Sequence, residues 1–114
     1  GGIRPDDEQP GFKHAVIKPA IVGDLEWVRS SHESPYGKIV SNWDRKEDAL
    51  EFEIIIPPNT SASIYIPARD GDVVTESGLQ IGDAEFKWSR HSEETILVKT
   101  GSGRYQFKVE RNAL

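Results

Sequence analysis

The stretch from Ala49 to Pro67, ALEFEIIIPPNTSASIYIP, constrains the fold more than any other part of the chain. Large apolar side chains occupy every second position of its first half, namely Leu50, Phe52, Ile54 and Ile56. Glu51 and Glu53 stand between them. A period of two residues is typical of a β-strand with one buried and one solvated face. Because each of these apolar side chains contributes roughly 1.5–3 kcal/mol when fully buried, the remaining chain has to cover this face.

The second half of the stretch predicts another strand. Pro57, Pro58 and Asn59 end the first strand, because proline offers no N–H to a neighbouring strand and asparagine tolerates turn conformations. Alternation then resumes from Ser61 to Ile66. We therefore expect the chain to reverse at the two prolines and to form two antiparallel strands that share one buried face.

Short alternating or apolar runs continue along the chain. They predict strands within residues 12–18, 22–31, 38–44, 84–89, 95–99 and 104–110, and short strands around 73–81. Ser34-Pro35-Tyr36-Gly37 is typical of a hairpin turn, and Gly101-Ser102-Gly103 predicts a tight reversal between the last two strands. No apolar pattern of helical period occurs. The expected fold is all-β, an antiparallel β-sandwich of jelly-roll or Greek-key type with about eight or nine strands.

Composition narrows the functional classes. The 114 residues suit one domain, and the formal charge of −5 with scattered Lys and Arg argues against a nucleic-acid partner. No apolar run is long enough for a membrane span, and the absence of cysteine excludes disulfides and thiolate chemistry. The chain starts at Gly1 without a methionine, from which we expect a piece of a longer protein.

Several motifs, read in order, resemble a known family. They are PGFKHAVIKP (10–19), VGDLEW (22–27), SPYGKI (34–39), IPPNTSASIYIP (56–67), VTESG (74–78) and GSGRYQF (101–107). Together they cover nearly the whole chain and resemble the C-terminal β-sandwich domain of bacterial α-L-rhamnosidases of glycoside hydrolase family 78. No single motif is specific, so the resemblance depends on their order and spacing.

The resemblance implies a division of labour within a larger enzyme. Such enzymes remove terminal α-L-rhamnose with inversion, using two glutamates of an (α/α)6 barrel that precedes the sandwich. Residues 1–11 would then be a linker that joins the barrel to a sandwich domain at 12–114. The implied partners are the barrel of the same chain and, through the parent enzyme, a rhamnose-containing glycan. No catalytic residue, cofactor or metal is expected in this chain.

A few side chains are candidates for contact with partners. Phe12 and His14 lie beside the expected linker and are candidates for a domain interface. Tyr36, Trp88 and His91 are the candidates for carbohydrate binding, which would matter most if the chain were an independent carbohydrate-binding module. Trp27 and Trp43 alternate in phase with aliphatic neighbours, so we expect both in the core. An interaction or oligomerisation domain, marked by an exposed apolar patch, is the third alternative.

The remaining polar motifs favour structural roles. The three histidines are too far apart in sequence to suggest a metal site, and Asp70-Gly71-Asp72 lacks the further oxygen ligands that Ca²⁺ needs. Asn59-Thr60-Ser61 matches the N-glycosylation pattern, but the turn already accounts for its asparagine.

Overall fold

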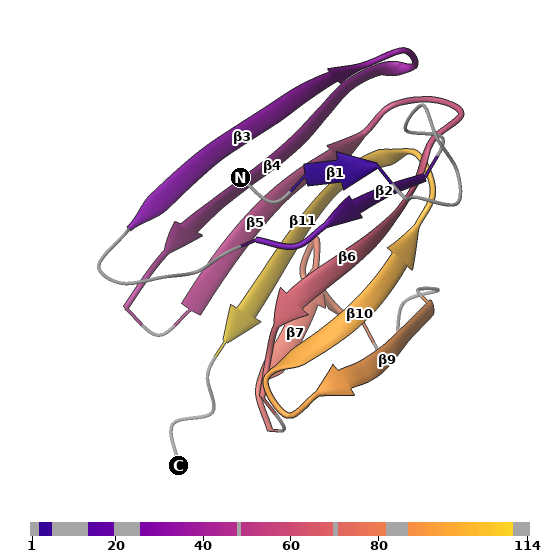
Figure 1. The fold of residues 1–114 in the computed structure, drawn as a ribbon. Helices are drawn as coiled ribbons and strands as arrows, with labels where there is room; N and C mark the ends of the chain where they lie inside the picture. The colour runs from indigo at the N-terminus through magenta and orange to yellow at the C-terminus, as the bar shows by residue number, and fades with distance from the viewer. Residues whose placement is uncertain are drawn as a thin grey trace.

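The computed structural model describes residues 3–5, 14–19, 26–47, 49–69, 71–81 and 87–110. All regular elements in these ranges are strands, and they form two sheets that face each other (Figure 1). The predicted all-β sandwich is therefore confirmed, although the described ranges hold eleven strands rather than eight or nine. In the same ranges, no helix is long and apolar enough to cross a membrane.

The first sheet has five strands in the order β1-β2-β6-β10-β9. Their bounds are β1 Ile3–Pro5, β2 His14–Ile17, β6 Ser61–Pro67, β10 Thr95–Thr100 and β9 Lys87–Ser92. The β2–β6 pair is parallel, and the other pairs are antiparallel. Strand β1 lies within residues 1–11, for which the sequence predicts a linker and no strand, because its three residues carry no detectable period. The domain boundary after residue 11 stays a prediction.

The second sheet has six strands in the order β3-β4-β5-β11-β7-β8. Their bounds are β3 Trp27–Ser34, β4 Gly37–Arg45, β5 Ala49–Ile56, β11 Gly103–Glu110, β7 Val73–Glu76 and β8 Leu79–Gln80. All of its pairs are antiparallel. The turn predicted at Ser34–Gly37 is confirmed: Ser34 pairs with Gly37, and the Ser34 Oγ donates to the Gly37 carbonyl oxygen at 2.7 Å.

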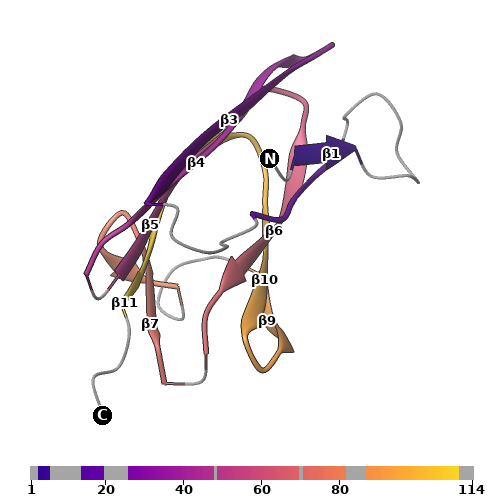
Figure 2. The same cartoon turned by 60° about the vertical axis from the view of Figure 1, so that its left-hand side comes forward.

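The two predicted reversals are wrong in their pairing. β5 and β6 do not pair with each other but belong to different sheets, as do β10 and β11 (Figure 2). The segment after β5 carries the chain from one layer to the other. Within it, Pro57 is buried and Asn59 adopts a φ of 63°. Strands β5 and β6 still bury their apolar residues in one core, because the inner faces of the two sheets face each other.

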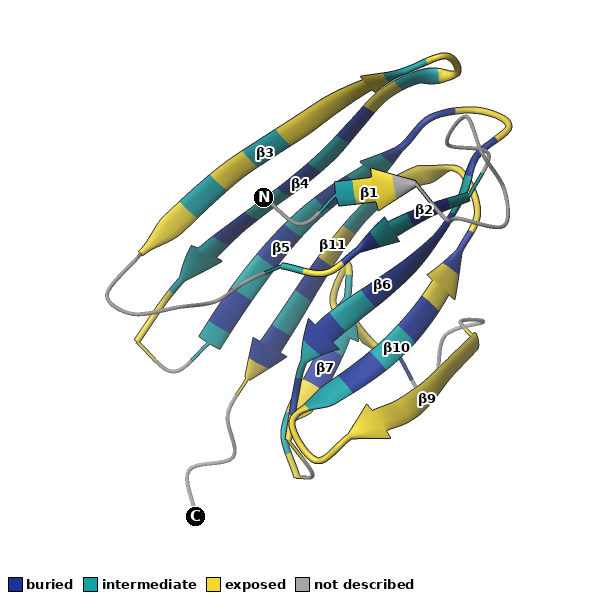
Figure 3. Ribbon diagram, in the orientation of Figure 1, coloured by how far each residue is buried: buried dark blue, intermediate teal, exposed yellow. Residues whose placement is uncertain are grey.

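The core lies between the sheets and contains the predicted apolar face. Its largest fully buried side chains are Phe107, Ile17, Ile39, Ile54, Ile64, Ile66, Ile96, Val98 and Val109. Buried and less buried positions alternate along β5, whereas every residue of β9 is exposed (Figure 3).

The two tryptophans expected in the core behave differently. Trp43 is buried, with 2% of its surface exposed, which confirms the prediction, but Trp27 is 59% exposed. Val28 pairs with Trp43 and packs against the core, so Trp27, one residue earlier, has to point to the opposite face of the sheet. The sequence places Trp27 on a strand but does not show which of the two alternating faces is covered.

Candidate functional site

A groove of about 700 Å³ lies on the outer face of the six-stranded sheet. Its polar lining includes Arg29, Asn42, Asp44, Glu53, Gln106 and Lys108, which come from strands β3, β4, β5 and β11. Asn42 is paired with Glu53 across β4 and β5, and Glu53 with Gln106 across β5 and β11. Side chains at paired positions share one face, so the sheet register alone brings these groups together.

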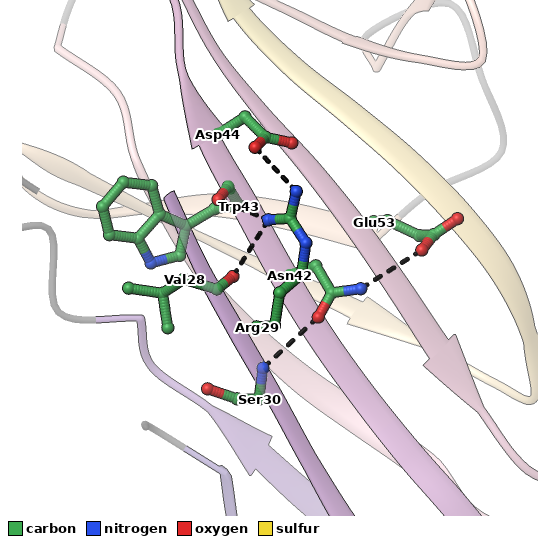
Figure 4. A network of polar contacts seen from close by, with 7 residues as sticks. All are labelled: Val28, Arg29, Ser30, Asn42, Trp43, Asp44 and Glu53. Carbon is green, nitrogen blue, oxygen red and sulfur yellow. Dashed lines mark hydrogen bonds and ion pairs between the residues drawn. The ribbon is translucent and has the colours of Figure 1, made fainter. Parts of the chain in front are cut away.

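Arg29 is held in place at the β3 side of the groove. Its Nη2 donates to the Asp44 Oδ1 at 2.9 Å, and its Nη1 donates to the carbonyl oxygens of Trp43 at 3.2 Å and Val28 at 3.3 Å (Figure 4). The guanidinium carbon also lies 5.1 Å from the centroid of the Trp27 ring. Because both partners of the ion pair are partly exposed, the pair contributes little stability and serves mainly to orient the guanidinium.

Asn42 occupies the middle of the same network. Its Oδ1 accepts a hydrogen bond from the Ser30 backbone N–H at 3.3 Å, and its Nδ2 donates to the Glu53 Oε1 at 3.3 Å (Figure 4). The amide therefore links three neighbouring strands. Around it, the groove is lined by four carboxylates and two cationic side chains: Asp44, Glu51, Glu53 and Glu110, with Arg29 and Lys108. The groove therefore carries a net negative charge.

A second polar cluster lies on the outer face of the five-stranded sheet. The Nδ1 of His14 hydrogen-bonds with the Ser61 Oγ at 2.5 Å, and its Nε2 hydrogen-bonds with the Ser63 Oγ at 2.8 Å. Both ring nitrogens are thus engaged by hydroxyl groups of β6. The contact ties together the parallel pair of strands and leaves neither nitrogen positioned to bind a metal.

Apolar and aromatic groups continue this outer face. Tyr65 packs edge-on against His91, with 4.9 Å between the ring centroids, and the Lys18 ammonium lies 5.4 Å from the Tyr65 ring. Leu97 pairs with Tyr65 across the sheet, and both are partly buried. The five strands of this sheet contain Lys and Arg but no Asp or Glu. We call this surface, defined by His14, Val16, Ser63, Tyr65 and Leu97, the basic-sheet face.

The structure does not gather the three candidates for carbohydrate binding into one site. Tyr36 is 40% exposed in the β3–β4 turn, whereas Trp88, 45% exposed, and His91 lie on β9 in the other sheet. Their binding of sugar stays a prediction. His14 lies on the basic-sheet face, and Phe12 is outside the described residues.

The sequence did not reveal the groove, neither Arg29 in its lining nor Trp27 beside it on the same face of the sheet. The alternation of Trp27 and Arg29 along one side of β3 was the available signal, but it required knowing which side faces outward. In the part of the chain that the structure describes, no three His, Asp or Glu side chains are grouped as a metal site would require. Asp70 of the Asp-Gly-Asp motif is not among the described residues.

Comparisons with known proteins point in one direction. The family model described as "Bacterial alpha-L-rhamnosidase C-terminal domain" matches residues 2–81. An alpha-L-rhamnosidase of Formosa agariphila is 27% identical over 110 residues, which are 96% of this chain and 12% of that protein. An alpha-L-rhamnosidase of Alteromonas sp. is 33% identical over 96 residues, covering 75% of this chain and 10% of that protein.

Solved structures agree with these sequence matches. The alpha-L-rhamnosidase from Dictyoglumus thermophilum has a TM-score of 0.81 at 25% identity, over 96% of this chain and 12% of the other. The Streptomyces avermitilis alpha-L-rhamnosidase complexed with L-rhamnose has a TM-score of 0.79 at 25% identity, over 95% of this chain and 10% of the other. The chain thus spans 12% or less of the length of each relative that it matches here.

Proposed function

The chain belongs to the family of bacterial alpha-L-rhamnosidase C-terminal domains, and from this membership we propose that it is the non-catalytic accessory domain of an α-L-rhamnosidase. In this proposal an upstream (α/α)6 barrel removes terminal α-L-rhamnose with inversion, and the sandwich packs against the barrel and supports it. The observation that carries the proposal is the family match over residues 2–81.

The environment of the carboxylates supports a non-catalytic role. An inverting glycosidase needs an acid and a base on opposite sides of the scissile bond, roughly 6.5–9.5 Å apart, with the acid in surroundings that keep it protonated. Asp44 is instead paired with Arg29, and Glu53 accepts a hydrogen bond from Asn42. Both carboxylates project from the same face of one sheet, so they are not placed on opposite sides of a glycosidic bond as the acid and the base.

The basic-sheet face is the surface that we propose for contact with the barrel. Its apolar members Val16, Tyr65 and Leu97 point away from the core yet are only partly exposed. Interfaces between domains of one chain combine such apolar groups with polar ones that are already satisfied, as His14 is by its two serines. The absence of Asp and Glu from these strands suits a barrel surface that carries acidic groups.

A matched pair of substitutions tests this assignment. Leu97→Glu places a charge on the basic-sheet face, and Val40→Glu makes the same change at a partly buried, outward position of β4 in the other sheet. In the 114-residue chain both variants should keep the wild-type fold. In the full-length rhamnosidase that contains this chain, only Leu97→Glu should lower the melting temperature and the rate of aryl rhamnoside hydrolysis.

Two results would contradict the proposal. Hydrolysis of an aryl α-L-rhamnoside by the purified chain alone would place catalysis within it. If Leu97→Glu and Val40→Glu changed the melting temperature and the hydrolysis rate of the full-length enzyme equally, the basic-sheet face would be excluded as the interface.

A further inference from the structure

Trp27 is a large aromatic side chain exposed next to the groove of the six-stranded sheet. It pairs with Asp44 across β3 and β4, so both side chains are on the groove face. The Arg29 guanidinium lies over its ring, yet 59% of the tryptophan surface is still exposed. A side chain of this size and exposure, oriented by a neighbour that is itself fixed, offers a flat apolar surface to a ligand.

The groove beside Trp27 supplies polar groups at fixed positions. The Arg29–Asp44 pair and the Asn42–Glu53 pair hold their planar groups on the same side of the sheet (Figure 4). Gln106 adds an exposed amide from β11 to the same groove. Carboxylates, guanidinium groups and amides together both donate and accept hydrogen bonds, which is what a row of sugar hydroxyls requires.

We propose that this groove binds a neutral saccharide, with one sugar ring stacked on Trp27 and its hydroxyl groups bonded to Arg29, Asp44 and the residues beyond them. The site is distinct from the basic-sheet face, because the two surfaces belong to opposite outer faces of the sandwich. A domain packed against a barrel through one sheet would therefore still present the groove of the other sheet to a glycan.

The charge of the groove selects the class of ligand. Its four lining carboxylates outnumber its two cationic side chains, and one of those cations, Arg29, is already paired with Asp44. An anionic sugar such as a uronate, or a phosphate, would be repelled. Among the described residues, no cluster of three potential metal ligands is present to bridge an anion through a cation. A neutral sugar can bind without a bridging cation, because it carries no charge that the carboxylates would repel.

Titration of the 114-residue chain with sugars tests the proposal. The probes are L-rhamnose, D-galactose and a neutral rhamnose-containing disaccharide, with D-galacturonate as the anionic comparison, and amide chemical shifts are followed by NMR. The variants are Trp27→Ala, Trp27→Phe and, as a matched control, Trp88→Ala, which removes another exposed tryptophan from the other sheet. Amide spectra without ligand establish that each variant is folded.

The expected result is saturable binding of at least one neutral sugar, with shifts concentrated on β3, β4, β5 and β11. Trp27→Ala should weaken binding at least about tenfold, whereas Trp27→Phe should retain most of it and Trp88→Ala all of it. A flat titration with every neutral sugar would overturn the inference, as would loss of binding in Trp88→Ala but not in Trp27→Ala. Tighter binding of galacturonate would contradict the charge argument. None of these results bears on the barrel contact, which the Leu97→Glu variant tests separately.

Discussion

Gly37→Ala should lower the free energy of unfolding by about 1–5.5 kcal/mol, because it combines backbone strain with a steric overlap. Gly37 ends the turn between β3 and β4 with a φ of +135°, a conformation that residues with a side chain rarely adopt. A Cβ added there would lie 2.9 Å from the Pro57 Cβ, closer than real Cβ atoms approach. Pro57 is buried where the chain leaves β5 for the other sheet, so neither partner can easily move away.

The expected loss of stability is the sum of two costs, reduced by one gain. Strain at such a φ costs of order 1–3 kcal/mol, and overpacking against a rigid neighbour costs about another 1–3 kcal/mol. Replacing glycine also restricts the unfolded chain, which returns about 0.4–1 kcal/mol. Other glycines of the chain separate these terms. Gly78 has a φ of +90° but nothing within 4 Å of an added Cβ, and Gly101 has neither the unusual φ nor a close neighbour.

The assay is urea unfolding of the three Gly→Ala variants, followed by tryptophan fluorescence. Gly37→Ala should be the least stable. Gly78→Ala should lose about 0–2.5 kcal/mol, which is the strain less the gain from restricting the unfolded chain, and Gly101→Ala should be unchanged or more stable by up to about 1 kcal/mol. If Gly37→Ala is no less stable than Gly78→Ala, the overlap of the added Cβ with Pro57 does not contribute to the loss of stability.

Two further predictions concern the core and the pH dependence of stability. Trp43→Ala should cost about 3–5 kcal/mol of unfolding free energy because its side chain is buried, whereas Trp27→Ala should cost less than about 1 kcal/mol; similar losses would refute the outward placement of Trp27. Burial raises the pKa of Tyr105 above its ordinary value of 10.0, and the carboxylate of Glu76 adds to the rise, against a lowering by the Thr100 side chain. The folded state therefore holds the hydroxyl proton of Tyr105 more tightly than the unfolded state does. The contribution of this hydroxyl to stability is complete below pH 10.0 and is lost as the pH rises further. Tyr105→Phe should be less stable at pH 7 by about 0.5–1.5 kcal/mol, since the hydroxyl donates to backbone carbonyl oxygens, but should lose less stability than wild type between pH 9 and 11 in urea titrations at each pH.

Local sequence patterns were sufficient to locate most of the strands. Alternation predicted β4, β5, β6 and β11 close to their observed bounds, and the Ser34–Gly37 turn was predicted from its proline and glycine. A resemblance spread over six motifs predicted the family. The alternation and the turn residues depend on amino acids that are close together in the sequence, so they can be recognised without knowing the fold.

The partners of the strands, and with them both candidate surfaces, were decided by the tertiary structure. His14 meets Ser61 only because β2 lies parallel to β6, a contact across 47 positions of the sequence. Trp27 lies on the outer face that carries the groove only because Val28, the next residue of the strand, turns toward the core. Alternation defines two faces of a strand but does not say which one is covered, and the same turn residues can close a hairpin or carry the chain to the opposite sheet. The choice depends on which arrangement buries all the apolar faces together, and that is a property of the whole chain.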